Sequence, residues 1–232
     1  MHRSKKYKES LKLIDRKKHY SVDEAIELVN KTSYSNFVGS LDLVVNFNIP
    51  SKRKNDSVRG SITLPHQMDT EKKIVVIAEK KDQKIAKEAG ADEVGLDELI
   101  EKLKEGYSEF DILIATPNVM PKVASLGPVL GPKGLMPNPK NNTVTEDLEK
   151  VIKNYKAGKM NFKVDDHGSI KAKIAKLDMK KDEQKENLIA FLKKTYTETR
   201  IYGPQRLKDV ILSATMGPAI KVDTSDVLKE IK

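Results

Sequence analysis

The sequence predicts a two-domain protein of mixed α/β and α+β class. A split α+β domain would combine residues 1–65 with residues 160–232, and a three-layer, Rossmann-like α/β domain would be inserted at residues 66–159. Two observations predict this division. Positive charge is concentrated in the two ends of the chain, and the hydrophobic pattern changes from alternation at the ends to buried strands alternating with helices in the middle.

The charge distribution separates the three blocks. The chain has 232 residues with 43 Lys and Arg against 34 Asp and Glu, a formal net charge of +9. Residues 1–65 hold 13 basic and 7 acidic side chains, residues 66–159 hold 15 and 16, and residues 160–232 hold 15 and 11. A positive excess favours a polyanionic partner, because Lys and Arg displace its condensed counterions. The neutral middle is expected to take no part in that binding; a single domain with a patchy surface is the alternative.

Composition excludes several classes of function. The chain has no cysteine, so it has no disulfide, no thiolate metal site and no cysteine nucleophile. No apolar run approaches the ~18 residues that cross a bilayer, and the start of the chain lacks the apolar core of a signal peptide. We therefore expect a soluble, cytoplasmic protein with no membrane contact, no cofactor and no metal. The histidines lie too far apart in sequence for a local ligand pair: His2, His19, His66 and His167.

The first block predicts a helix followed by a half-buried strand. Ser21 and Glu24 form a capping box ahead of apolar residues at helical spacing, which indicates a helix over 22–31. Residues 41–49 then alternate between apolar and polar, as a strand does when one face of its sheet is wet. After Pro50 the block is predicted to continue with a charged loop over 51–56 and a return strand over 58–64.

The middle block has the pattern of a parallel sheet. Its run IVVIA at 74–78 is apolar throughout, as in a strand buried on both faces, and a helix over 83–90 follows with Gly90 at its C′ position. Strand and helix signals then alternate, which implies βαβ units and three layers. The remaining expected elements are a strand at 93–95, a helix at 97–104 ending before Gly106, a strand at 111–115 and a helix at 145–154.

The last block returns to the period-two pattern of the first. Residues 161–164 and 169–177 alternate as strands, a helix is expected over 183–196, and a strand over 210–215. This shared pattern supports a discontinuous domain built from both chain ends.

Catalytic and phosphate-binding motifs are missing from the sequence. The glycine-rich stretch at 127–134 lacks the spacing of a dinucleotide or P-loop motif, and its prolines remove amides that would bind a phosphate. No motif places a general base beside a nucleophile. The acidic residues at 98, 101 and 105 follow helical spacing, which is typical of a solvated helix face. The sequence therefore predicts a protein that is not an enzyme.

Two further segments admit more than one interpretation. Residues 126–140, LGPVLGPKGLMPNPK, contain so many glycines and prolines that they predict a rigid loop with no helix or strand. Interleaved apolar residues favour a loop packed at a domain junction over a plain linker. The basic run over 3–18 is either an arm that contacts the polyanion or a solvated helix.

Two features suggest contact with RNA. Phe37 stands just before a predicted strand, where an aromatic ring can stack on a base or sugar, although a core residue is the commoner interpretation. Thr215, Met216 and Gly217 directly follow another strand. A glycine there permits close approach, a threonine hydroxyl can bond a 2′-OH and a methionine can pack on sugar carbons, but a generic β-turn has a similar sequence.

Five segments, taken in order, resemble the bacterial-type large-subunit ribosomal protein L-one family: FVGSLDLVVNFNI, SVRGSITLPH, LGPVLGPKGLMPNPK, YKAGKMNFKVDDHGSI and ATMGPAIKVD. The resemblance covers nearly the whole chain. It implies a monomeric structural protein at the base of a mobile stalk near the tRNA exit site, in a cytoplasmic or organellar large ribosomal subunit. Its partners would be 23S-type ribosomal RNA, exit-site tRNA whose release it assists, and its own messenger, whose translation it represses.

The resemblance also implies which residues contact RNA. The expected positions are Phe37, Ser40, Gly168, Lys171, Ser213, Thr215, Met216 and Gly217. The chain departs from the family pattern at four places. Asn36 stands where the family commonly has a basic residue, and Lys171 where it commonly has a histidine. Ala175 and Lys176 replace a glycine–lysine pair of the family, and Lys133 stands where the family usually has arginine. The first departure removes a phosphate contact and the second supplies one.

An alternative function is an RNA-modifying enzyme. In that hypothesis the middle domain would bind a nucleotide or a methyl donor at the carboxyl ends of the strands at 74–78 and 111–115, where ligands of such sheets bind. A ligand pocket at that edge would distinguish this hypothesis from the ribosomal one.

Overall fold

The structure is a computed structural model that describes residues 4–49, 58–68, 72–165, 167–203 and 206–231. The chain forms two compact units. Unit 1 combines Met1–Met68 with Asn161–Lys232, and unit 2 is Asp69–Met160. These limits lie within three residues of the expected domain boundaries, and the predicted α/β and α+β class is confirmed. The expected charged loop at 51–56 and the basic residue Arg3 lie outside the described residues.

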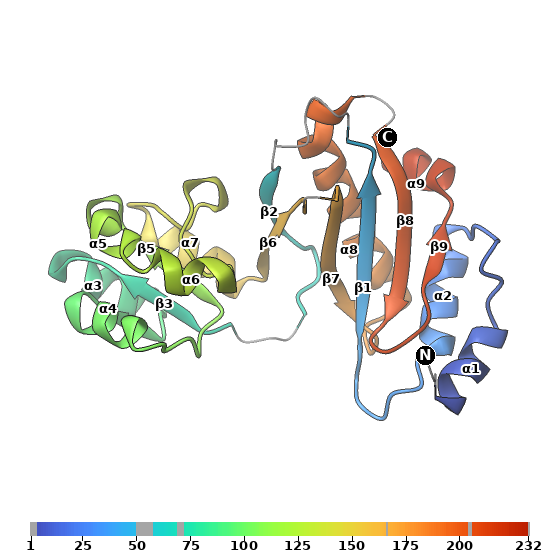
Figure 1. Ribbon diagram of the computed structural model, residues 1–232, viewed down its shortest axis with the longest axis horizontal. Helices are drawn as coiled ribbons and strands as arrows, with labels where there is room; N and C mark the ends of the chain where they lie inside the picture. Colours follow the sequence, from blue (N-terminus) through green and yellow to red (C-terminus); the bar gives the residue numbers. More distant parts are fainter. Residues whose placement is uncertain (1–3, 50–57, 69–71, 166, 204–205, 232) are drawn as a thin grey trace. The chain divides into compact units, whose positions relative to one another are not determined.

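Unit 1 is built on a four-stranded sheet with the strand order β7-β1-β8-β9 (Figure 1). Strand β1 is antiparallel to both of its neighbours, so β7 and β8 run parallel to each other on either side of it. The elements of the unit are α1 (Lys5–Lys12), α2 (Val22–Thr32), β1 (Ser40–Phe47), β2 (Arg59–Thr63), β7 (Ser169–Lys176), α8 (Lys181–Glu198), β8 (Leu207–Ala214), β9 (Ile220–Val222) and α9 (Thr224–Ile231).

The sheet of unit 1 has one buried and one uncovered face. Alternation along β1 sends Leu41, Leu43, Val45 and Phe47 into the core, all less than 5% exposed. Helices α2, α8 and α9 pack against the sheet, and Figure 1 shows α8 behind β7 and β1. The helices therefore cover the apolar face and leave the polar face of β1 uncovered.

The predicted return strand exists as β2 but pairs differently from the expectation. It forms a two-stranded sheet with β6 (Lys159–Lys163) instead of pairing with β1. Both edges of β1 are already occupied by β7 and β8, so β1 has no free hydrogen-bonding edge. Gly60 of β2 lies against the ring of Phe162 in β6, where an added Cβ would stand 2.6 Å from the ring.

Unit 2 is a three-layer α/β unit around a parallel sheet with the strand order β4-β3-β5, as predicted. Successive residues of β3 point to opposite faces: Ile74 and Val76 pack with α3 and α7, and Val75 and Ile77 with α4, α5 and α6. The elements are β3 (Ile74–Ile77), α3 (Lys80–Glu88), β4 (Glu93–Gly95), α4 (Asp97–Lys104), β5 (Ile112–Ala115), α5 (Met120–Ala124), α6 (Gly127–Lys133) and α7 (Leu148–Lys156).

The glycine- and proline-rich segment is not the irregular loop that its sequence predicts. Residues 127–133 form helix α6, which packs against the core of unit 2. Pro128 occupies the first turn, where a missing N–H does no harm, Pro132 lies near the last residue, and Gly134 ends the helix in the left-handed conformation at φ 71°. Leu126 and Leu130 are fully buried in the core, so tertiary packing holds this short helix.

Two other elements refine the sequence-based expectations. Helix α7 begins at Leu148, three residues later than predicted, because Val144 pairs with Ala115 and the Thr145 N–H donates to the Ala115 carbonyl. Of the N-terminal basic run, Lys5–Lys12 form α1, a mostly exposed helix, and residues 13–18 lie beyond it in irregular structure. In the described part of the chain, no helix is long and apolar enough to span a membrane.

We predict that a chain joining residues 1–68 directly to residues 161–232 folds without unit 2, because it retains every strand of the four-stranded sheet. Circular dichroism and a single cooperative urea transition would show this. Residues 1–68 alone serve as the control and should remain unfolded, since β1 then lacks both of its partners. Failure of the joined chain to fold, with unit 2 restoring the transition, would contradict the division into units.

Candidate nucleic-acid interface

Two segments that are far apart in sequence are joined at the end of the sheet where β1 begins. The backbone N–H of Ser40 donates to the Thr215 hydroxyl at 2.8 Å, and the two hydroxyl oxygens lie 2.9 Å apart. The Thr215 N–H donates to the Ser40 carbonyl, and the Ser40 hydroxyl donates to Asp42 at 2.8 Å. A Cβ on Gly39 would stand 3.3 Å from that of Thr215, so the segments are tightly packed.

The turn after β8 presents Met216 to solvent. Its side chain is 68% exposed, and its backbone is left-handed with φ 68°. The Gly217 N–H closes the turn on the Ala214 carbonyl at 2.8 Å, and a Cβ on Gly217 would stand only 3.0 Å from that of Ala214. A side chain at residue 217 would crowd Ala214, so glycine suits this tight turn, which leaves the apolar side chain of Met216 at its tip.

Phe37 lies on the segment that precedes β1, and its side chain is 58% exposed. The interpretation of Phe37 as a core residue is therefore wrong. The inward-facing side chains of β1 begin at Leu41, so the chain at Phe37 has not yet entered the sheet. The Ser35 hydroxyl donates to the Phe37 carbonyl at 3.0 Å, and the ring remains available for stacking.

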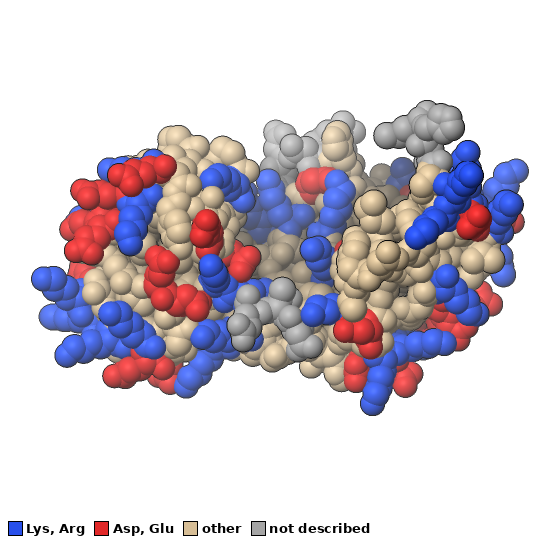
Figure 2. All heavy atoms as spheres, turned by 90° about the horizontal axis from the view of Figure 1, so that it is seen from below, with Lys and Arg blue, Asp and Glu red and all other residues tan. Residues whose placement is uncertain are grey.

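The uncovered face of the sheet continues from this end as rows of mostly polar side chains. Ser213 and Lys171, two of the predicted positions, lie in these rows on either side of β1. Figure 2 looks at the molecule from the end where β1 begins and shows, on unit 1, uncharged surface with both basic and acidic side chains around it. Across the strands, Asp42 lies between Lys173 and Ser213, Val44 between Lys171 and Ile211, and Asn46 between Ser169 and Asp209.

Gly168 lies at the opposite end of the sheet from the other predicted residues. Its carbonyl accepts from the Phe47 N–H at 2.7 Å, and Phe47 is the last residue of β1. At about 3.3 Å per residue, the ends of this strand are roughly 23 Å apart. The structure therefore brings Phe37, Ser40 and the 215–217 turn together, whereas Gly168 could contact only a ligand that follows the whole face.

The turn that contains Gly168 is organised by Asp165. Its carboxylate accepts from the backbone N–H groups of His167 and Ser169 and pairs with the Lys171 ammonium at 3.2 Å. Partial burial acts to raise the pKa of the Asp165 carboxyl, but the Ser169 N–H, Lys171 and the His167 N–H together lower the pKa below its ordinary value. The carboxylate thus stays charged and holds Lys171, which reduces the positive charge that Lys171 offers to a phosphate.

The departures from the family pattern fall in different environments. Asn36 is exposed beside Phe37, so no cation stands there. Ala175 is fully buried, and its methyl group takes up core space that a glycine would leave empty. Lys133 lies in unit 2, where it donates to the Ser108 hydroxyl at 2.8 Å.

Sequence reasoning missed four residues of this surface: Tyr34, Val38, Asp42 and Lys173. Val38 is 60% exposed beside Phe37, and the Tyr34 hydroxyl donates to the Met216 carbonyl at 2.7 Å. Asp42 and Lys173 could have been found from the alternation of the strands, which assigns every second residue to the wet face. Nothing in the sequence links Tyr34 to a residue 182 positions away.

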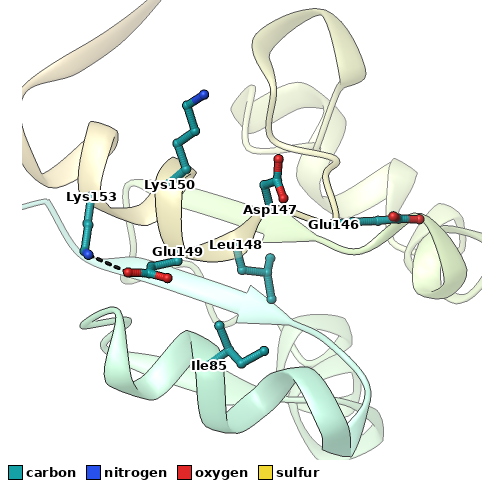
Figure 3. A pocket seen from close by; sticks show the side chains of 7 residues that line it. All are labelled: Ile85, Glu146, Asp147, Leu148, Glu149, Lys150 and Lys153. Atoms are coloured by element: carbon teal, nitrogen blue, oxygen red, sulfur yellow. Dashed lines mark hydrogen bonds and ion pairs between the residues drawn. The ribbon is translucent and has the colours of Figure 1, made fainter.

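A groove in unit 2 bears on the enzyme alternative. It has a volume of about 540 Å³, lies between α3 and α7, and is lined by Ile85, Glu146, Asp147, Leu148, Glu149, Lys150 and Lys153 (Figure 3). Lys153 pairs with Glu149, and Figure 3 shows Lys150 pointing away from the groove. Three acidic side chains and two lysines line the groove, so it offers no excess of positive charge to an anionic nucleotide.

An uncovered antiparallel sheet backed by helices, with an exposed aromatic residue and a glycine turn at one end of its inner strands, is the kind of surface that sheet-based RNA-binding proteins use. Among the described residues, no group of three or more His, Asp or Glu side chains could hold a metal ion.

Comparison with known proteins specifies the class further. Residues 29–218 match the model of the ribosomal protein L1p/L10e family, and the chain belongs to that family. The large ribosomal subunit protein uL1 of Lactobacillus gasseri is 45% identical over 221 residues, covering 94% of this chain and 96% of that protein. The uL1 proteins of Lactobacillus acidophilus and Limosilactobacillus reuteri are 45% and 40% identical, over 94% and 95% of this chain and 96% of each relative.

We predict that Thr215→Val lowers the free energy of unfolding by about 1–3 kcal/mol, because the Ser40 N–H loses its acceptor in a half-buried place. Urea denaturation measures the change. Thr197→Val is the matched control, since that exposed hydroxyl only donates to the Lys193 carbonyl of its own helix. Equal stability of the two variants would show that the Thr215 hydroxyl does not hold the two segments together.

Proposed function

We propose that this chain is a structural component of the large ribosomal subunit and binds a folded junction of 23S-type ribosomal RNA through unit 1. The observation that carries the proposal is the pair of exposed side chains, Phe37 and Met216, on two segments that Ser40 and Thr215 tie together. The uL1 relatives, which match nearly the whole chain, support the same assignment.

The geometry suggests how each residue would contribute. The Phe37 ring would stack on a base, an interaction worth about 1–3 kcal/mol. Met216 would pack on sugar carbons beside the backbone of Gly217. The Thr215 oxygen accepts from Ser40 and retains a lone pair for a 2′-OH. Lys171 and the exposed Lys173 would meet phosphates on the open face, and Gly168 would lie at the far end of the same RNA.

Unit 2 would have a different role. Figure 2 shows acidic and basic side chains interspersed over its surface, in keeping with the near-neutral charge of the middle block. It would therefore add little RNA affinity. We propose that it extends from the RNA-bound unit as part of the mobile stalk near the tRNA exit site, where the protein assists release of deacylated tRNA.

The same interface would also serve in repression. We propose that the free protein, acting as a monomer, binds a similarly folded element in its own messenger and blocks translation. One surface suffices for both RNAs if they differ in affinity. A 10-fold preference for ribosomal RNA, about 1.4 kcal/mol, directs the protein to the messenger only when ribosomal sites are filled.

We predict that Phe37→Ala weakens binding to a large-subunit ribosomal RNA transcript about 10-fold or more, because stacking on one base is lost. Met216→Ala should weaken it about 5-fold or more through lost apolar contact. Ile85→Ala is the control, since Ile85 is 47% exposed on α3 of unit 2, the unit that is expected to add little RNA affinity. Filter binding measures all three affinities. Parental affinity for both interface variants would remove this end of the sheet from the RNA site.

We further expect the messenger and the ribosomal RNA to compete for one site. Increasing ribosomal RNA should displace a labelled leader of the protein's messenger completely, and Phe37→Ala should weaken both complexes by similar factors. A variant that loses one RNA while it keeps the other at parental affinity would show that the two sites are separate.

A further inference from the structure

The turn that carries Met216 has a backbone conformation that its own residue does not favour. Among the described residues, two that are not glycine have a left-handed φ, Asn142 and Met216. Asparagine adopts this conformation readily, whereas a methionine side chain clashes with the neighbouring carbonyl and offers no polar group in return. Residue 216 is the third of the four-residue turn closed by Ala214 and Gly217, a position that takes glycine or asparagine when φ is positive.

Bonds from another segment hold this turn. Its base is fixed by the hydrogen bonds of Thr215 to Ser40. At its tip, the carbonyl of Met216 accepts the hydroxyl of Tyr34 at 2.7 Å. Tyr34 lies two residues beyond the end of α2 and three before Phe37, and its side chain is partly buried. The tyrosine thus ties the segment that carries Phe37 to the residue that presents Met216.

We propose that Tyr34 is a positioning residue of the RNA interface. This inference rests on the proposed function and adds a residue that holds the interface in its binding conformation. The hydroxyl of Tyr34 orients the peptide between Met216 and Gly217, and the methionine side chain consequently points to solvent beside the 33–39 segment. Because the turn is held before RNA arrives, binding does not have to supply the ordering entropy of the turn.

The proposal separates Tyr34 from a residue that contacts RNA itself. A direct contact would act independently of the methionine side chain. A positioning residue acts through Met216, so its effect should vanish when the Met216 side chain is removed. A double-mutant cycle measures this difference.

The experiment compares the parent chain, Tyr34→Phe, Met216→Ala and the double variant for binding to a large-subunit ribosomal RNA transcript. Tyr34→Phe removes only the hydroxyl and should weaken binding about 3- to 10-fold, within the range of one lost hydrogen bond. In the Met216→Ala background the same change should have less than a 2-fold effect. Tyr20→Phe is the matched control: its hydroxyl accepts from the Asp15 N–H elsewhere in unit 1, and the variant should bind RNA like the parent.

Urea denaturation of each variant confirms that the folded population is measured. Parental affinity in Tyr34→Phe, with Met216→Ala weakened, would overturn the positioning role and leave the proposed function standing. Fully additive losses would assign Tyr34 a direct RNA contact instead, and would also overturn the positioning role. Parental affinity in both Met216→Ala and Phe37→Ala would remove the proposed interface, and the positioning role with it.

Discussion

The central place of β1 in its sheet is the constraint on which the rest of unit 1 depends. Both edges of this strand pair with strands from the last third of the chain, β7 on one side and β8 on the other. The first 68 residues therefore cannot complete a sheet by themselves. The proposed RNA interface depends on this pairing, because it brings Ser40 within hydrogen-bond distance of Thr215.

Unit 2 can interrupt the sequence of unit 1 because its own residues supply the contacts that stabilise it. Its strands are parallel and connected by helices within one continuous stretch, and each face of the sheet has its own apolar cluster. Both apolar clusters consist of residues of unit 2 itself, so the two chain ends that form unit 1 contribute nothing to them. Its interspersed acidic and basic side chains give unit 2 no positive excess for a polyanion, which is in keeping with the proposed RNA binding by unit 1.

Elements with a strong local sequence signal were predicted well, and elements that depend on tertiary contacts were predicted poorly. The helix that begins after Ser21 and the buried strand at 74–77 match the structure closely, because capping and continuous apolarity are local signals. Helix α6 was missed, since its prolines and glycines oppose a helix that only the burial of Leu126 and Leu130 maintains. Strand β9 and helix α9 were also missed; β9 has three residues and needs β8 for its pairing.

The fold class, the basic character of both chain ends and the residue types of the proposed interface could be predicted from the sequence, because charge, periodicity and motif are properties of neighbouring residues. Only the tertiary structure decided which of those residues share a surface. It exposed Phe37, placed Gly168 at the far end of β1 and connected Tyr34 to Met216. The physical reason is that strand register and long-range hydrogen bonds join residues more than a hundred positions apart, and no local pattern records them.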